Sequence, residues 1–405
     1  MKFEGSSAIS KGLGNALEII SEVGSLPPIR GVWYFVDPKS GADTSDGRTI
    51  DTALKGIRAA YAKCTDSAGD GICIMSRSSA TTADTTCYLG GSLIWAKYGI
   101  TVVGLGAGQV HNNRARIASK DRARTYTTQV SWTTTTVTDT RGGLLAIFEV
   151  GDAILATVTA GTAITSVNKI TAVTDKTLTL TDAVIANATP GAGTISTHCV
   201  PLISVTGKNN WFHNVAFIQQ GDTTADLGCV SISTTGDDNH FSRCWFNGGG
   251  NATSAAETGC SDLVLGASEC AFDECIFGSN ATARDAANAH IILGISTTGI
   301  GQDYFNNCRV ISNSSTAGHL GISITNAATL GGWVQFKGCS FVNWSSGAVT
   351  ALTNVIGGVD TNNMGLLFWD CAMVGWAIWA NAAWDMSYTA DSVAAPFGGR
   401  AILTD

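Results

Sequence analysis

Acidic side chains in the C-terminal half are the residues whose type and spacing could do chemistry. Asp238 ends an Asp-Asp pair, and Asp273 and Glu274 form an Asp-Glu pair further along the chain. Cleavage of a glycosidic bond needs an acid and a base or nucleophile about 5–9.5 Å apart. Elimination from an acidic sugar chain would use carboxylates for Ca²⁺ and a base such as Arg309. Because Asp and Glu are also ordinary turn residues, we predict no catalytic site here; the alternative is that these four residues are catalytic.

Two surface features could bind a partner. Aromatic side chains dominate interface cores and also stack on sugars, so Trp344, Trp369 and Trp384 are candidate glycan or interface residues, whereas Trp376 and Trp379 are expected to cap the last turn of the fold. A second feature is a run of basic residues that predicts a loop facing an acidic partner surface, with a solvated loop as the alternative. The run comprises Arg114, Arg116, Lys120, Arg122 and Arg124.

Other chemistry is not indicated. The 12 cysteines include no Cys-x-x-Cys and the six histidines are scattered, so we predict no metal site and no cofactor. Gly104-Leu105-Gly106-Ala107-Gly108 lacks the last glycine of a dinucleotide loop. The net charge of −8 argues against nucleic acid as a partner. Apolar runs are too short to span a membrane, and no secretory leader is recognised, so we expect synthesis in a reducing cytoplasm.

A recurring phrase, aromatic-x-x-Cys-x-apolar, predicts the architecture that positions these residues. Its leading phenylalanines lie 29, 31, 33, 31 and 32 residues apart, which is typical of a coiled strand with loops of variable length. A second apolar run in each repeat, such as Ile322-Ser323-Ile324, adds a strand to each turn of the coil. The phrase begins at Phe241, Phe272, Phe305, Phe336 and Phe368, and a sixth copy that begins at Phe212 lacks the cysteine, with Val215 at its position.

The spacing inside the phrase makes two further predictions. Cysteine and the last apolar residue share one face, but the leading phenylalanine is out of phase with them, so the chain must bend between phenylalanine and cysteine. The cysteines then form a ladder of small buried hydrophobic side chains. Disulfides are not expected, because equivalent positions about 4.8 Å apart would leave one of the five thiols unpaired.

The N-terminal segment differs from the coil. Ile9, Leu13, Leu17, Ile20 and Val23 have helical spacing, with Gly24 just beyond, so residues 1–30 are expected to form an attachment arm with an amphipathic helix. A strand over 32–36 and a second helix over 50–62 are predicted to begin and cap the coil.

A resemblance to a known fold supports this arrangement. The stretch from Tyr34 to Gly47, the segment 52–60, and Gly69-Asp70-Gly71-Ile72-Cys73-Ile74 resemble the opening of pectate-lyase-like right-handed β-helix proteins, and Ile100-Thr101-Val102-Val103-Gly104-Leu105-Gly106 resembles their next turn. That superfamily contains polysaccharide lyases and hydrolases, phage tail spikes and noncatalytic virion proteins, so the resemblance implies fold more closely than function.

The predicted class is therefore all-β, a right-handed parallel β-helix with an N-terminal helical arm and a small inserted antiparallel β-domain. The insert is expected because residues 126–198 are rich in Thr, Val and Ile in short alternating runs; a long excursion of the coil is the alternative. The predicted parts are the arm at 1–30, the capping elements and first turns at 31–125, the insert at 126–198, the main β-helix at 199–375 and a C-terminal cap at 376–405.

For function, the sequence favours a non-enzymatic bacteriophage virion protein, namely a head decoration protein on the virion surface. Its arm would attach it to the major capsid protein or another virion protein, and the resemblance implies self-association as a trimer. One alternative is a tail spike or depolymerase that binds or cleaves a host surface glycan. Another is a purely adhesive module that uses the C-terminal tryptophans.

Overall fold

The computed structural model describes most of the chain from residue 29 onward. The described ranges are 29–76, 82–105, 115–120, 123–144, 146–158, 162–184, 186–220, 228–284, 286–294, 301–316, 318–324, 332–345, 354–358, 365–380, 385–387 and 400–404. The predicted arm, with Ile9, Leu13, Leu17, Ile20 and Val23, lies outside them. No helix in the described part is long and apolar enough to cross a membrane.

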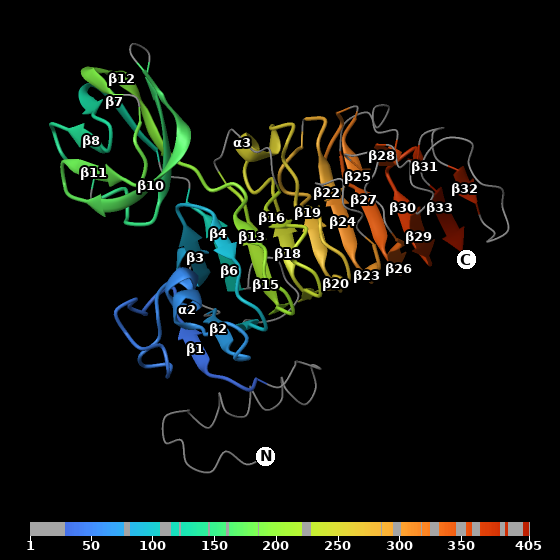
Figure 1. The fold of residues 1–405 in the computed structure, drawn as a ribbon. Helices are drawn as coiled ribbons and strands as arrows, with labels where there is room; N and C mark the ends of the chain where they lie inside the picture. Colours follow the sequence, from blue (N-terminus) through green and yellow to red (C-terminus); the bar gives the residue numbers. More distant parts are fainter. Residues whose placement is uncertain are drawn as a thin grey trace.

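The chain forms a right-handed parallel β-helix, as the repeated phrase predicts (Figure 1). Three parallel sheets, called sheets A, B and C, run along the coil. Sheet A contains, in spatial order, β1 (Trp33–Val36), β2 (Gly71–Met75), β5 (Thr101–Leu105), β14 (Trp211–His213), β17 (His240–Ser242), β20 (Ala271–Asp273), β23 (Asp303–Asn306), β26 (Val334–Lys337), β29 (Gly365–Trp369), β33 (Arg400–Thr404) and β32 (Asp385–Ser387).

Sheets B and C complete each turn. Sheet B contains β3 (Thr86–Leu89), β6 (Ala115–Ser119), β15 (Val215–Ile218), β18 (Trp245–Asn247), β21 (Ile276–Gly278), β24 (Arg309–Ser312), β27 (Ser340–Asn343) and β30 (Ala372–Val374). Sheet C contains β4 (Leu93–Trp95), β13 (Ile203–Val205), β16 (Val230–Ile232), β19 (Leu263–Leu265), β22 (Ala289–Leu293), β25 (Leu320–Ile324), β28 (Asn354–Gly358) and β31 (Ile378–Ala380).

Stacked phenylalanines form the centre of the coil. The leading phenylalanines of the six phrases are at most 1% exposed, and successive rings lie 4.5–5.2 Å apart and nearly parallel. Neighbouring strands of a sheet lie about 4.8 Å apart, and each turn places a phenylalanine at the equivalent inward position. One aromatic ring per turn therefore gives a continuous column. The column fixes the register between turns.

The predicted bend between phenylalanine and cysteine is confirmed. The residue before each cysteine has a positive φ, with 52° at Arg243, 53° at Glu274 and 51° at Asp370. This left-handed conformation turns the chain from sheet A to sheet B and returns the cysteine to the interior. Large side chains rarely adopt it, so the corner is set by the packing on both sides.

The cysteine ladder is also confirmed. Each ladder thiol donates to the carbonyl oxygen of the phenylalanine one turn back, with Sγ–O distances of 3.2–3.3 Å from Cys244 to Phe212 through Cys371 to Phe336. All 12 cysteines are free thiols. Burial raises the pKa of Cys73 to about 12, so that thiol is neutral at pH 7.

A ladder of polar side chains lies just before the strands of sheet A begin. Asn210 Oδ1 accepts from the N–H of Ile100, Asn239 Oδ1 accepts from Asn210, and Asp303 Oδ1 accepts from Cys270, over 2.9–3.0 Å. Asp303 places a carboxyl group in this ladder, where Asn210 and Asn239 have amides, and its side chain is fully buried.

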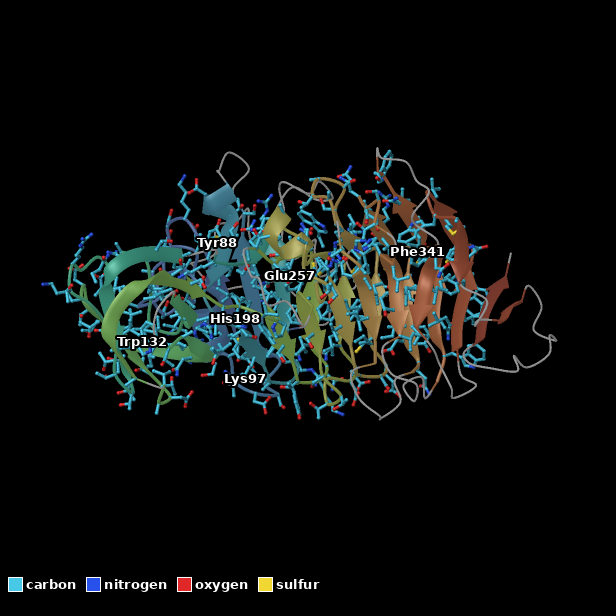
Figure 2. All side chains as sticks on the ribbon, turned by 90° about the horizontal axis from the view of Figure 1, so that it is seen from above. Tyr88, Lys97, Trp132, His198, Glu257 and Phe341 are labelled. Atoms are coloured by element: carbon cyan, nitrogen blue, oxygen red, sulfur yellow. The ribbon has the colours of Figure 1, made fainter. Side chains whose placement is uncertain are left out.

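The insert is a closed antiparallel barrel beside the first turns (Figure 1). Thirteen buried residues form its separate core, and Trp132 lies inside it in Figure 2. Its strands are β7 (Ala123–Trp132), β8 (Thr136–Asp139), β9 (Ala153–Val158), β10 (Ile164–Val173), β11 (Thr177–Leu180) and β12 (Asn187–Thr197).

Three short helical segments are described: η1 (Thr82–Thr85), α2 (Ile57–Lys63) and α3 (Ala252–Ala255). The prediction of a helix over 50–62 is wrong in its first half. Leu54 instead bridges Val36 and exchanges backbone hydrogen bonds with Phe35 and Asp37, so it is buried as an extended residue against β1. Pairing with β1 gives both backbone groups of Leu54 a hydrogen-bond partner, whereas the first turn of a helix leaves its N–H groups without one inside the helix.

The expected C-terminal cap is partly a continuation of the coil. β31 extends sheet C, and β33 extends sheet A beyond β29. Trp376 is buried and stacks on His319, and Trp379 packs on Phe341 and Phe368 near the end of the phenylalanine column.

Candidate functional site

The outer face of sheet A carries two rows of polar and aromatic side chains. In each strand the phenylalanine points inward, so the residues on either side of it lie on the outer face of the sheet. The strand register aligns these residues from β14 to β29. One row is Trp211, His240, Ala271, Tyr304, Gln335 and Leu367, and the other is His213, Ser242, Asp273, Asn306, Lys337 and Trp369.

Trp211, Ser242 and His213 form one hydrogen-bonded chain in these rows. Nε1 of Trp211 donates to Ser242 Oγ over 2.9 Å, and Oγ lies 2.8 Å from Nδ1 of His213. An indole N–H can only donate, so Ser242 accepts from it and its own proton is available to Nδ1. Burial, assisted by the charges of Arg243 and His240, lowers the pKa of His213 to about 4, so this ring is neutral at pH 7 and can accept.

His240 and Asp273 form a second pair one strand further along. Nε2 of His240 lies 2.5 Å from Oδ2 of Asp273, and the amide of Asn306 donates to Oδ1 over 2.8 Å. The hydrogen bond from His240 is the main cause that lowers the pKa of Asp273, and Asn306 adds to it. The ring of Trp211 lies 4.3 Å from that of His240, so the two pairs are in contact.

Charged residues follow the corner between sheets A and B. Arg243 Nε donates to Glu274 Oε2 over 2.9 Å, and both side chains are about half exposed. The pair joins two residues that have the left-handed backbone conformation on consecutive turns of the coil. Because it is solvated, it contributes little to stability.

The four catalytic candidates do not gather at one place. Asp273 lies in the outer row of sheet A and Glu274 at its corner, whereas Arg309 begins β24 on sheet B. Asp238 lies before the strands of sheet A, at the end opposite to Glu274. Its hydrogen bond with Glu269 raises the pKa of Glu269. The only one of these four that joins a network on the outer face of sheet A is Asp273.

Three of the five basic residues do not lie in an exposed loop. Arg116 and Lys120 are buried at 6% and 8% exposure, and Lys120 pairs with Glu149 at 2.5 Å and Asp152 at 3.5 Å. Arg124 pairs with the barrel residue Asp139 at 2.8 Å. The expectation of an exposed basic loop is therefore wrong for these three, because Arg116 and Lys120 are buried and carboxylates of the barrel pair with Lys120 and Arg124. Arg114 and Arg122 lie outside the described residues.

The comparisons with known proteins concern the fold. This chain is a β-helix. No protein-family model matches it, and no curated protein is similar to it in sequence. Among solved structures it is similar to a pectin methylesterase from Erwinia chrysanthemi, with 11% identity, coverage of 88% of this chain and 81% of that one, and a TM-score of 0.42.

Two phage proteins are also among the similar structures. The tailspike of Pseudomonas phage LKA1 has 12% identity over 78% of this chain and 56% of its own, with a TM-score of 0.27. The tailspike of Acinetobacter baumannii bacteriophage AP22, solved in complex with capsular saccharide, has 7% identity over 100% of this chain and 75% of its own, with a TM-score of 0.18. These likenesses identify no residue of the site.

The aromatic candidates are found in different surroundings. Trp369 is half-buried and ends the outer row of sheet A. Trp344 is 63% exposed and follows β27 of sheet B, away from that row. Trp384 lies outside the described residues.

Sequence reasoning missed Trp211, His213, His240 and Ser242. The signal was present, because each lies directly beside a leading phenylalanine of the repeated phrase. Aligning the phrases on phenylalanine would have placed all four on the outward face. What the sequence lacked was a reason to separate these polar neighbours from turn residues.

A buried group of similar composition lies between sheets B and C. Nδ1 of His290 lies 2.5 Å from Asp262 Oδ2, its Nε2 lies 2.5 Å from Ser312 Oγ, and Ser312 also contacts His319 at 3.1 Å. Arg284 pairs with the second oxygen of Asp262. Asp262, His290 and Ser312 are 0% exposed, so no substrate can reach them.

Metal binding has no support in the described part of the chain. No group of three or more His, Cys, Asp or Glu residues there is arranged to hold an ion. The outer face of sheet A offers hydrogen bonds, aromatic surface and a polarised hydroxyl instead.

Proposed function

We propose that the protein binds an extended host polysaccharide along the outer face of sheet A, as the adhesive part of a phage tail spike. The observation that carries this proposal is the pair of outward rows, in which Trp211, Tyr304 and Trp369 lie on three different strands, among imidazole, amide, carboxylate and ammonium groups. Aromatic faces pack on the apolar faces of sugar rings, and the polar groups between them bind hydroxyls. Host capsular polysaccharide is the ligand class that we propose.

The geometry of the sheet suits a long ligand. Strands about 4.8 Å apart present equivalent positions at regular intervals, so a polymer of sugars lying across the strands meets a new pair of outward residues at each strand. Many weak contacts of one polymer add to a high overall affinity. The fixed hydrogen bonds of Trp211 and His240 reduce the cost of ordering those side chains on binding.

The carboxylates of this face favour binding over glycosidic cleavage. A glycosidase needs one carboxylic acid with a raised pKa to protonate the leaving oxygen. Asp273 has a lowered pKa instead, and Glu274 is paired with Arg243. The head decoration role rests on residues 1–30, of which only 29 and 30 are described, so no observation here favours it.

Binding of capsular polysaccharides to the purified full chain tests the proposal. Trp211→Ala and Trp369→Ala should each weaken binding at least about tenfold, since truncating an aromatic anchor of an interface commonly costs about 1–2 kcal/mol or more. Trp344→Ala is the matched control, because this tryptophan is exposed on a different sheet. Equal binding by all three variants, or no binding to any capsular polysaccharide tested, would contradict the proposal.

A further inference from the structure

We propose that Ser242 and His213 form a nucleophile and base that remove small acyl esters, such as O-acetyl groups, from the polysaccharide bound on sheet A. The choice of substrate rests on the proposed function, whereas the chemistry rests on the side chains themselves. Ser242 lies on β17 and His213 on the adjacent strand β14, so two paired strands hold both groups in one register.

The hydrogen-bond directions suit nucleophilic attack. Trp211 donates to Ser242 Oγ over 2.9 Å and leaves the hydroxyl proton available to Nδ1 of His213, 2.8 Å away. A serine hydroxyl becomes a nucleophile when an adjacent base accepts its proton in this distance range. Burial keeps His213 neutral at pH 7, so Nδ1 can accept from the hydroxyl, although the lowered pKa of about 4 makes it a weaker base than an ordinary histidine.

His240 is a positioning residue for this pair. It lies two residues before Ser242 on the same face of β17, and its Nε2 contacts Asp273, whose other carboxylate oxygen accepts from Asn306. Its ring centroid lies 4.3 Å from that of Trp211, so it packs against the indole that donates to Ser242 Oγ.

The reaction proceeds in two balanced halves. Oγ of Ser242 attacks the ester carbonyl carbon while its proton moves to Nδ1 of His213, and the acyl–oxygen bond to the sugar breaks as His213 returns the proton to the leaving sugar oxygen. Water then attacks the acyl-serine with the same base, which releases the carboxylic acid and restores Ser242. No further reactant is needed.

The burial of Ser242 limits the acyl group. The residue is 8% exposed, because Trp211 and His213 lie against it. A long acyl chain would have to displace these rings. An acetyl group on a sugar hydroxyl needs the least room and is therefore the substrate class that the site fits.

Hydrolysis of 4-nitrophenyl acetate by the full chain tests the chemistry without any glycan. Ser242→Ala and His213→Gln should each lower the rate at least about hundredfold, the usual contribution of a nucleophile or general base. Ser340→Ala, on the outer face of sheet B, should leave the rate unchanged. An equal rate in wild type and Ser242→Ala would overturn the proposal.

Labelling of the wild-type protein by a fluorophosphonate, followed by peptide mass spectrometry, keeps the test independent of variant folding. We expect the label on Ser242 and none on the buried Ser312. An unlabelled Ser242 would overturn the proposal. Polysaccharide binding by Ser242→Ala separates the two proposals: binding without ester hydrolysis supports both, whereas hydrolysis by a wild-type protein that binds no polysaccharide leaves only the ester chemistry.

Discussion

Two groups of Asp, His and Ser lie in the same coil, one outside sheet A and one between sheets B and C. The outer group, Ser242 with His213 and His240 with Asp273, is partly exposed, and its side chains leave some polar atoms toward solvent. The inner group, Asp262, His290 and Ser312, has the Asp–His–Ser order of serine hydrolases but is fully buried. Residue type and spacing are therefore insufficient to identify a site.

The difference lies in what water can do for each group. Inside, each charge or polar atom depends on a protein partner, so Arg284 and His290 both contact Asp262 and the network stabilises one packing of sheets B and C. Outside, water satisfies whatever the protein leaves open, so a ligand can replace it. The same residue types thus hold the fold in one place and are available for recognition and catalysis in the other.

The largest expected effect is the loss of the inner carboxylate. Asp262→Ala should lower the free energy of unfolding by about 3–5 kcal/mol, because it leaves Arg284 and His290 buried without their partner. Asp273→Ala, its outer counterpart, should cost about 1 kcal/mol or less, because water can solvate His240. Urea unfolding of both variants measures this contrast. If both variants lose a similar free energy of unfolding, burial does not distinguish the inner group from the outer one.

Acid should destabilise the protein through the inner histidines. Burial is the main cause that lowers the pKa of His290 and His319 in the folded state below the ordinary value of about 6.5. A depressed pKa contributes stability above the unfolded value, and that stability is lost as the pH falls below about 6.5, by up to about 1.4 kcal/mol per pH unit for each histidine. Urea unfolding from pH 7.5 to 5 measures the slope.

His319→Gln is the control for that slope, because glutamine can still form hydrogen bonds but does not take up a proton. Its free energy of unfolding should therefore fall less steeply with decreasing pH, by about 1.4 kcal/mol per pH unit, which corresponds to one proton. The outer His213 has a pKa of about 4, so it should also reduce stability as the pH falls from about 6.5 toward 4. The substitution His213→Gln should therefore also reduce the slope. An unchanged slope in both variants would show that other groups govern the acid sensitivity.

A smaller effect is expected in the ladder at the beginning of sheet A. Burial raises the pKa of Asp303 to about 8, and its Oδ2 has no hydrogen-bond partner in the described part of the structure. A raised pKa gives stability that is complete below the unfolded value of about 4 and is lost as the pH rises through about 8. Asp303→Asn should therefore raise the Tm, more at pH 8 than at pH 5, because an amide has no charge to bury. An equal gain at both pH values would refute the titration argument.

The smallest effect is expected at the corner pair. Glu274→Gln should change the free energy of unfolding by less than about 1 kcal/mol and should leave ester hydrolysis unchanged, because the pair with Arg243 is half exposed. Thermal unfolding and the 4-nitrophenyl acetate assay measure both. A loss of activity here would extend the site from the outer row to the corner of the coil.

Part of the candidate site could be predicted and part could not. Asp273 and Trp369 were candidates because acidic and aromatic residues are conspicuous, but His213 and Ser242 were not, because they are 29 residues apart and meet only through the pairing of β14 and β17. Arg116 and Lys120 were misplaced for the opposite reason: a run of basic residues predicts a solvated loop, yet strand β6 and the adjoining barrel enclose them.

The sequence by itself determined the coil. The phenylalanine and cysteine of each phrase set the inward column, the bend and the faces of each strand, because side-chain direction in a strand follows a local period of two. Aligning the phenylalanines also pairs the outward neighbours of consecutive phrases, such as His213 and Ser242. Only the tertiary structure decided how deeply such polar side chains are buried, because loops of unequal length, whose course the phrase does not specify, cover some parts of the coil and leave others open. Ser242 and His213 therefore lie on the outer face of sheet A, whereas Ser312 and His290 are fully buried.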